Sequence, residues 1–501
     1  MRYLPNGKQM KAADRYTIET IGIPSVVLME RAALKTVEVL ESRGVDTSRT
    51  LLVCGGGNNG GDGFAVARLL AEKGRKAEIF FTGKESSMSP ECRIQKQIAE
   101  NMGLPIFTEF PSREYTVIID AVFGVGLSRD ISGALSNVIQ NMNDAPGYKV
   151  AIDIPSGVCA ESGKILGTAF RADLTVAMAC TKAGCELYPG KEKAGETVAV
   201  PIGIDPGFFL KVPDVCFTYE REDIPRLLPP RRADSHKGSY GHVLMITGSY
   251  GMAGASCLAA EAAYTVGAGL VQICTPEDNR VIVQQFLPEA ILSCYNEFDG
   301  NKLDKLLQWA DVVCIGCGLG TGEQAEKLLS HTLENVKVPC VVDADGLNLL
   351  SRNRELLRRA EAPLILTPHI MEMSRLTGMS VPEIKENRMA VLKEFTENSS
   401  AVCVLKDSRT VVAQRGKQVF VNLAGNSAMA KAGAGDVLAG TITGLLAQGM
   451  PPFEGAALGV CLHACGGDEI REHLGGYSVM ARDLIRGIQM CIKKAGEQME
   501  K

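Results

Sequence analysis

The sequence contains few aromatic residues and has no excess of positive charge. Its 501 residues include one Trp, and Phe, Trp and Tyr together make up 5%. Few side chains are therefore able to stack on the bases of a single strand. The net charge of −5 at pH 7 also argues against a surface for nucleic acid or for an anionic membrane. A small molecule is the expected partner.

Long apolar runs and a signal peptide are missing as well. The longest uncharged stretch, residues 238–260, is interrupted by glycines, serines, Tyr240 and His242, so no segment qualifies as a membrane span. The charged start of the chain, with Lys8 and Lys11, does not fit a signal peptide. Sixteen cysteines are scattered through apolar runs, and the one Cys-x-x-Cys, at 314–317, has no second pair at zinc spacing. This distribution is typical of reduced, buried thiols and predicts a cytoplasmic protein.

The order of apolar segments predicts an α/β fold in two domains. Short runs rich in Val and Ile alternate with helix-length segments in both halves of the chain, which indicates doubly wound, mostly parallel sheets. A proline-rich, charged stretch at 205–235 has the character of a linker, so we predict domains at 1–219 and 220–501. The predicted strands are 76–81, 116–120, 149–153, 174–178 and 197–201 in the first half, and 242–246, 270–274, 312–315, 340–342, 364–366 and 401–405 in the second, which also has a hairpin at 410–413 and 418–422.

Three predicted strand ends in the first half carry polar residues. The apolar run 51–53 leads into Cys54-Gly-Gly-Gly-Asn-Asn-Gly-Gly-Asp-Gly63, and a segment with helical spacing follows. Such a turn brings the backbone close to an anion at a helix N-terminus, and its Asn and Asp side chains offer further donors and acceptors. Asp120 ends a second strand, and Asp153 ends a third, with Ser156 close behind it. Because ligands of parallel sheets bind beyond the carboxyl ends of the strands, these residues predict a small-molecule site.

The segment Ala432-Gly-Ala-Gly-Asp436-Val-Leu-Ala-Gly440 is the strongest chemical signal in the second half. Its small residues place backbone N–H groups at a helix N-terminus, where they can hold a phosphoryl group. Asp436 lies in the first turn of this helix, near the place where a substrate hydroxyl would be activated. A carboxylate beside an anion site is suited to phosphoryl transfer to an alcohol. The simpler alternative is that Asp436 only favours the helix N-terminus electrostatically.

Other polar groups follow predicted strands of the second half. Asp343-Ala-Asp-Gly-Leu-Asn348 could orient a substrate or a hydrated metal, and His369 ends a Thr-Pro-His run at the next strand. Residues 406–410, Lys-Asp-Ser-Arg-Thr, offer charge and hydroxyl groups to a nucleotide phosphate. The glycines of 318–320 would let a ligand approach the backbone.

With these motifs in place, the chain resembles a known pair of fused enzymes. The second half resembles the ribokinase-like ADP- or ATP-dependent NAD(P)H-hydrate dehydratases, through residues 236–238, 248–255, 318–320, 343–349, 367–369 and 432–440. The first half resembles the NAD(P)H-hydrate epimerase domain, which has a Rossmann-like three-layer α/β/α fold, through residues 57–63, 123–127 and 153–157. Together the two resemblances cover nearly the whole chain and agree on one metabolite.

The resemblance implies a role for each matching residue. Asp436 and Asp153 would be catalytic. K⁺ in the epimerase domain would contact Asn59, Asp120 and Ser156, and Mg²⁺ would accompany ADP in the dehydratase domain. The substrates would be hydrated NADH and NADPH with ADP, and the chain is expected to form a homo-oligomer. The hydrate in the epimerase would be held by Asn58, Asn59, Gly60, Gly61, Asp62, Gly124, Val125, Gly126, Leu127, Ser128, Arg129, Asp130 and Asp153; the hydrate in the dehydratase by Ala255, Gly320, His369 and Asp436; and the nucleotide by Lys406, Asp407, Ser408, Arg409, Thr410 and Gly435.

Two departures from the family pattern and one alternative function remain at this point. The family usually has Pro-Gly-Glu after the His of the Thr-Pro-His run, whereas here Ile370-Met371-Glu372 follows, so a different local turn is expected. The early helix has residues 29–33, Met-Glu-Arg-Ala-Ala, where the family tends to have Glu-Asn-Ala-Gly. The alternative is a ribokinase-like kinase of a vitamin precursor or sugar, with the first half as a ligand-binding or scaffolding module.

Overall fold

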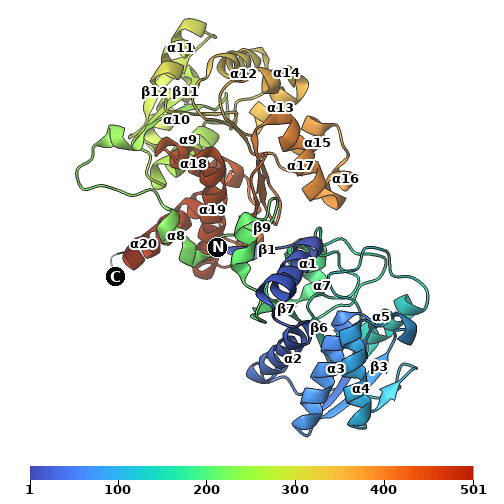
Figure 1. The fold of residues 1–501 in the computed structure, drawn as a ribbon. Helices are drawn as coiled ribbons and strands as arrows, with labels where there is room; N and C mark the ends of the chain where they lie inside the picture. The colour runs from blue at the N-terminus through green and yellow to red at the C-terminus, as the bar shows by residue number, and fades with distance from the viewer. Residues whose placement is uncertain (500–501) are drawn as a thin grey trace. The chain divides into compact units, whose positions relative to one another are not determined.

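The structure is a computed structural model that describes residues 1–499, and these residues form two compact units. The division falls between Phe217 and Thr218, and Met1 groups with the second unit. Each unit contains a largely parallel sheet that is covered by helices (Figure 1). The α/β fold class is therefore confirmed.

The first unit is built on a seven-stranded sheet with the order β4-β3-β2-β5-β6-β7-β8. All neighbouring pairs are parallel. Cys54 lies opposite Ala121, and Ile152 lies opposite Val176, so the strand ends that carry the predicted polar residues share one edge. The strands are β2 (Arg49–Cys54), β3 (Lys76–Phe81), β4 (Ile106–Phe107), β5 (Val117–Ala121), β6 (Tyr148–Ile152), β7 (Leu174–Met178) and β8 (Glu196–Val200).

Helices cover both faces of this sheet because its strands are apolar on both sides. On one face α2, α3 and α4 lie side by side (Figure 1). On the other face, Ile139 and Met142 of α5 pack in a core with Leu51 and Val53 of β2. The helices are α1 (Gly7–Tyr16), α2 (Ser25–Ser42), α3 (Asn58–Glu72), α4 (Pro90–Asn101), α5 (Ala134–Asp144), α6 (Ala183–Glu186) and α7 (Gly190–Ala194); the short strands β1 (Arg2–Leu4) and β9 (Cys216–Thr218) begin and end the unit.

The sheet of the second unit has the order β18-β17-β16-β15-β14-β13-β10-β11-β12. The strands from β16 to β12 are parallel, whereas β17 and β18 form the expected antiparallel hairpin. The strands are β10 (His242–Ile246), β11 (Leu270–Pro276), β12 (Ile291–Tyr295), β13 (Val312–Ile315), β14 (Cys340–Val342), β15 (Leu364–Leu366), β16 (Val402–Leu405), β17 (Val411–Ala413) and β18 (Val419–Val421).

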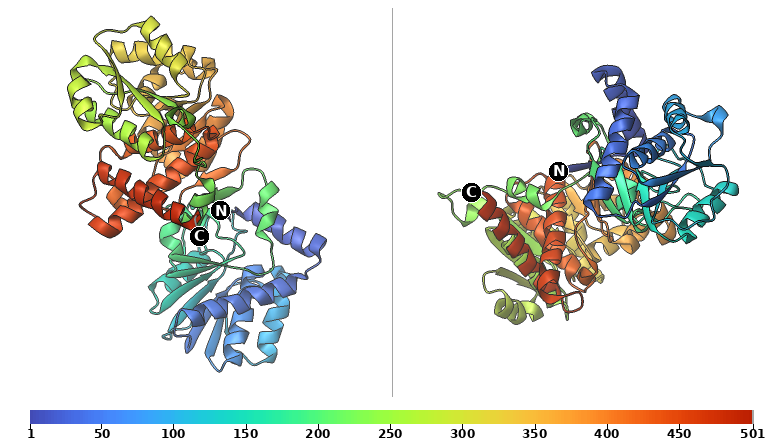
Figure 2. Two further views of the ribbon diagram at one scale, coloured as in Figure 1. Left: turned by 90° about the vertical axis from the view of Figure 1, so that its left-hand side faces the viewer. Right: turned by 90° about the horizontal axis from the view of Figure 1, so that it is seen from below.

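Two groups of helices enclose this second sheet. On one face, leucines of α11, α12 and α13 pack in a core with Leu244 and Val313 of the sheet. On the other face, α18 packs so closely on α9 that a Cβ at Gly440 would lie 2.0 Å from the carbonyl oxygen of Ala259. Helices α19 and α20 run side by side (Figure 2). The helices are α8 (Ile224–Leu227), α9 (Ala253–Thr265), α10 (Arg280–Phe286), α11 (Gly300–Trp309), α12 (Glu323–Asn335), α13 (Asp345–Arg352), α14 (Glu355–Arg359), α15 (Ile370–Thr377), α16 (Val381–Glu386), α17 (Arg388–Ser399), α18 (Ala434–Ala447), α19 (Pro452–Leu474) and α20 (Ala481–Met499).

The structure adds several elements to those expected from the sequence. Strand β12 and helix α20 were not predicted, and the stretch 205–235 contains β9 and α8. That stretch is therefore not a structureless linker. The sixteen cysteines are free, and fifteen of them are buried, as their apolar surroundings predicted. Among residues 1–499, no helix combines the length and apolarity that crossing a membrane requires.

Candidate active sites

A cavity of about 700 Å³ lies at the carboxyl ends of the strands of the first unit. The start of α3, the loop after β5 and the end of β6 contribute to its wall, because parallel strands bring their ends to one edge. Residues of the predicted hydrate site line it: Asn58, Asn59, Asp62, Gly124, Val125, Gly126, Leu127, Ser128, Arg129 and Asp153.

Three residues of the predicted hydrate site are not among those that line the cavity. Gly60 and Gly61 lie in the first turn of α3 and are buried. A Cβ at Gly60 would lie 1.9 Å from the carbonyl oxygen of Gly55, so this position serves the tight turn itself. Asp130 is exposed. The assignment of these three residues to the hydrate stays a prediction.

The residues predicted to contact K⁺ surround the segment that follows β5. Asp120 is fully buried, and its carboxylate accepts hydrogen bonds from the Ser156 hydroxyl (2.6 Å), the Ser156 amide (2.7 Å) and the Val122 amide (3.1 Å). Burial raises the pKa of Asp120 to about 6, although these hydrogen bonds act in the opposite direction. Both polar side-chain atoms of Asn59 are buried and have no partner among the described residues.

The oxygens of these side chains fit an alkali cation. Asp120 forms no ion pair among residues 1–499, so no described side chain balances its buried charge. A Cβ at Gly124 would lie 3.5 Å from Oδ1 of Asn59, which places this amide oxygen beside the same loop. Carboxylate, amide and hydroxyl oxygens are suitable ligands for an alkali cation.

Two acidic residues that line this cavity and a lysine beside it were not predicted from the sequence. Asp14 and Glu91 line the cavity together with Asp62 and Asp153. Burial and the nearby carboxylates of Asp153 and Asp14 raise the pKa of Asp62 well above its usual range. The ammonium of Lys182 contacts Oδ1 of Asp153. Lys182 follows β7, so its place after a strand end was the signal in the sequence that could have revealed it.

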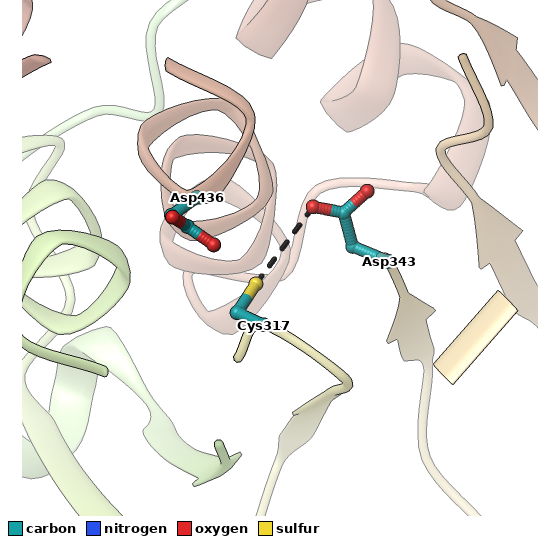
Figure 3. Close-up of side chains that lie close together, drawn as sticks. All are labelled: Cys317, Asp343 and Asp436. Carbon is teal, nitrogen blue, oxygen red and sulfur yellow. Dashed lines mark hydrogen bonds between the residues drawn. The ribbon is translucent and has the colours of Figure 1, made fainter. Parts of the chain in front are cut away.

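In the second unit, Asp436 lies in the first turn of α18 and faces two other potential ligands. Atoms of Cys317, Asp343 and Asp436 lie within 4.8 Å of one another, and Figure 3 shows that all three side chains point toward a common centre. The thiol of Cys317 donates a hydrogen bond of 3.8 Å to Oδ2 of Asp343. Gly433 ends the preceding turn with φ of 89°, a conformation that favours glycine.

Asp343 connects this cluster to a lysine predicted to bind the nucleotide. Its Oδ1 accepts hydrogen bonds of 2.6 Å from the Thr367 hydroxyl and from the Lys406 ammonium. Burial and the Asp343 carboxylate raise the pKa of Asp436 to about 6, while Cys317 and Lys406 partly offset this rise. Asp436 is therefore able to exchange protons near neutral pH, as a general base requires.

His369 caps the N-terminus of α15 at the end of the neighbouring strand. Its Nδ1 accepts hydrogen bonds of 3.1 Å from the amides of Met371 and Glu372, and Glu372 in turn accepts one of 2.8 Å from the His369 amide. Ile370 and Met371 stand where the family usually has Pro and Gly. They lie within a capping box that His369 and Glu372 form. The side chain of His369 is half exposed, and its Nε2 lies 3.3 Å from Oε1 of Glu372.

The remaining residues of the predicted dehydratase site lie near this cluster or turn away from it. A Cβ at Gly435 would lie 3.5 Å from Nζ of Lys406. The Gly320 amide donates to Asp345 at 2.8 Å, and a Cβ at Gly318 would lie 2.8 Å from that of Ala255. The side chains of Asp407 and Arg409 point elsewhere: Asp407 pairs with Arg388 at 2.6 Å, and Arg409 donates to the Leu423 carbonyl at 2.7 Å. The Ser408 amide donates to Oδ1 of Asp407 at 2.8 Å, and the Thr410 hydroxyl donates to the Asp407 carbonyl at 3.2 Å.

Comparison with known proteins matches each half of the chain to a family. Residues 25–184 match the family described as YjeF-related protein N-terminus, and residues 243–490 match the family described as NAD(P)H-hydrate dehydratase. The bifunctional NAD(P)H-hydrate repair enzyme Nnr of Moorella thermoacetica is 36% identical over 99% of this chain and 98% of its own. The chain belongs to the bifunctional NAD(P)H-hydrate repair enzymes. Other members of this repair family are similar over the same length: that of Coxiella burnetii is 37% identical over 98% of this chain and 100% of its own, and that of Escherichia coli is 33% identical over 96% and 92%.

A solved structure supports the fold expected for the dehydratase half of a repair enzyme. A ribokinase-like superfamily protein from Enterococcus faecalis is 28% identical, with a TM-score of 0.51, and covers 56% of this chain and 96% of its own. The ribokinase-like fold predicted for the second half is thus confirmed. As a member of the repair family, the chain is an enzyme with an epimerase and a dehydratase domain.

Proposed function

We propose that this chain restores hydrated NADH and NADPH through two active sites in separate domains. The epimerase, assigned to residues 1–219, interconverts the R and S hydrates. The dehydratase, assigned to residues 220–501, converts the S hydrate and ADP into NAD(P)H, AMP and phosphate. The observation that carries the proposal is the position of Asp436, which lies at the N-terminus of α18 and beside Asp343 and Lys406.

In the dehydratase, Asp436 takes the proton from the C6 hydroxyl of the hydrated ring. The terminal phosphoryl group of ADP moves to that oxygen and leaves AMP, while the N-terminus of α18 stabilises the negative charge. The C6–O bond then breaks with loss of phosphate, assisted by the lone pair of the ring nitrogen. Loss of a proton from C5 completes the double bond of NAD(P)H. Lys406 and Gly435 adjoin the place where the nucleotide phosphates would lie.

Mg²⁺ would enter the dehydratase site with ADP and would neutralise phosphate charge there. The oxygens of Asp343 suit this hard cation, whereas the Cys317 thiol does not. In the epimerase, Asn59, Asp120 and Ser156 would hold K⁺, which supplies positive charge next to the bound dinucleotide. Asp153 assists the loss of the C6 hydroxyl and the return of water to either face of the ring.

The direct test combines the full chain, ADP, Mg²⁺, K⁺ and an acid-generated mixture of the two hydrates. Complete return of the absorbance of reduced nicotinamide supports both activities. Return of only the S fraction refutes the epimerase. No return, together with phosphorylation of an added alcohol, would instead identify a small-molecule kinase. ATP in place of ADP, tested in parallel, decides the phosphoryl donor.

We also propose a cytoplasmic homo-oligomer. The buried, free thiols are compatible with a reducing compartment. Large apolar side chains such as Tyr250, Tyr477 and Met480 are more than 60% exposed, as is common at surfaces that join subunits. Light scattering coupled to size-exclusion chromatography measures the assembly directly, and a mass of one chain would refute it.

A further inference from the structure

We propose that Lys182 is the positioning residue of the epimerase site, where its buried ammonium anchors one oxygen of Asp153 and aims the other into the cavity. This inference rests on the proposed epimerase function of the first unit. It concerns a side chain that does not itself line the cavity and therefore acts through its partner.

Lys182 occupies an unusual place for a lysine. Its side chain is 1% exposed, although lysine is almost never fully buried without a partner. Its ammonium contacts Oδ1 of Asp153 and donates a hydrogen bond of 2.9 Å to the Met178 carbonyl. The chain reaches this position through a turn after β7, in which Ala179 has φ of 61°. The fold thus accommodates both a buried charge and an unfavourable backbone conformation at this strand end.

Asp153 is held in a way that leaves one oxygen for a ligand. Its φ of 69° is rare outside glycine, and its amide donates to the Val176 carbonyl at 2.8 Å. Both Lys182 and the Met178 amide, at 3.1 Å, donate to the same oxygen, Oδ1. Among the described residues, no hydrogen bond to Oδ2 is found, and Asp153 lines the cavity. One oxygen is anchored, so the other can face the reacting carbon.

The charges around Asp153 explain why it needs a cation. Asp14 and Asp62 interact with it electrostatically, and the pKa of each is raised by burial and by the Asp153 charge. Lys182 opposes this rise at Asp62. The ammonium of Lys182 therefore supplies positive charge beside a group of three carboxyl groups, Asp14, Asp62 and Asp153. The titratable and charged groups near the pair or lining the same cavity are Lys11, Asp14, Asp62, Glu91, Arg129, Cys180 and Cys185.

The test compares Lys182→Met and Lys182→Arg in the full chain, with Lys76→Met as a matched control at the exposed start of β3. The kcat and KM for epimerisation of the pure R hydrate are measured separately, and dehydration of the S hydrate by the same protein serves as the internal control. We expect Lys182→Met to lose at least about a hundredfold in epimerase kcat near neutral pH. Its KM for the R hydrate should stay within about threefold of the wild type, because Lys182 does not line the cavity. Lys182→Arg, which keeps the charge, should retain more activity, and Lys76→Met should match the wild type.

The outcomes separate this proposal from a purely structural role and from the proposed function. A Lys182→Met enzyme whose kcat lies within about threefold of the wild type, or one whose KM rises as much as its kcat falls, would overturn the proposal. If Lys182→Met does not fold, Lys182→Arg decides: a lower kcat at an unchanged KM supports the positioning role, and an unchanged kcat refutes it. Absence of epimerase activity in the wild type would refute the proposed function itself.

Discussion

Lys406 donates a hydrogen bond of 2.6 Å to Oδ1 of Asp343. This ion pair joins the end of β16 to the end of β14, two strands separated in the sheet by β15. The other oxygen of Asp343 accepts from Cys317, so the carboxylate faces the lysine on one side and the Asp436 cluster on the other. The ionisation of the proposed base therefore depends on residues that lie far from it in the sequence.

Replacing Asp436 with Asn should abolish dehydration without preventing nucleotide binding. The amide has the same shape as the carboxylate but cannot accept the proton of the C6 hydroxyl. We expect kcat to fall by about 10²–10⁴-fold. Isothermal titration with ADP should show an affinity close to that of the wild type. Epimerase activity, measured in the same protein, should be unchanged, and an active Asp436→Asn dehydratase would contradict the assignment of the base.

The dehydratase rate should fall in acid with a midpoint near pH 6. Burial raises the pKa of Asp436 to about 6, and the base works only when it is ionised. The rate is therefore fully present above this pKa and declines about tenfold for each pH unit below it. The check is a profile of kcat/KM for dehydration of the S hydrate between about pH 4.5 and 8. A rate that is flat down to pH 5 would show that another group is the base.

Lys406→Met should move this acid limb to higher pH. The ammonium lowers the pKa of Asp436, so its removal makes the carboxyl harder to ionise. The variant should approach the wild-type rate only in more alkaline solution. Lys417→Met, at an exposed lysine paired with Glu454, is the matched control and should leave the limb in place. An unmoved limb in Lys406→Met would mean that the lysine does not affect the base.

The sequence predicts the sheets well because their strands are apolar and regularly spaced. It misses β12, Ile291–Tyr295, whose Leu-Ser-Cys core is less clearly apolar and β-branched than the other strands. It also misses α20, although the apolar side chains of Leu484, Ile485 and Ile488 recur at helical spacing and are buried. The resemblance to the repair enzymes is confirmed by relatives that are similar over nearly the whole chain.

Site residues that belong to a strand-end motif could be predicted from the sequence. Residues whose role depends on a contact with a distant side chain could not. Asn58, Asp62 and Asp153 line the cavity as their strand-end positions suggest. Lys182 follows a predicted strand in the sequence, but its pairing with Asp153 depends on the turn after β7. Likewise, Cys317 lies in a Cys-x-x-Cys that favours a structural interpretation, yet its thiol faces Asp343. Such contacts join residues that are distant in the sequence, so the local sequence pattern does not predict them.

Two glycine substitutions in the dehydratase should have different effects: Gly435→Ala should weaken nucleotide binding, and Gly440→Ala should lower stability. A Cβ at Gly435 would lie 3.5 Å from Nζ of Lys406, an ordinary contact, so Gly435→Ala should fold normally. It would narrow the place proposed for the nucleotide and should raise KM for ADP by about tenfold, or about 1.4 kcal/mol. A Cβ at Gly440 would lie 2.0 Å from the Ala259 carbonyl oxygen, so Gly440→Ala should destabilise the unit by about 3 kcal/mol. Thermal unfolding and ADP kinetics of both variants provide the check; equal effects on stability would contradict the distinction.

Asn59→Ala should weaken the affinity of the epimerase for K⁺. Both polar atoms of this side chain are buried without a described partner. Their removal breaks no described hydrogen bond, so the variant should lose little stability. We expect the K⁺ concentration for half-maximal epimerisation to rise by about tenfold, or about 1.4 kcal/mol. The titration uses KCl against choline chloride at constant ionic strength. Asn141→Ala, at an exposed position of α5, is the control and should respond to K⁺ as the wild type does. An Asn59→Ala enzyme with an unaltered K⁺ titration would remove this residue from the cation site.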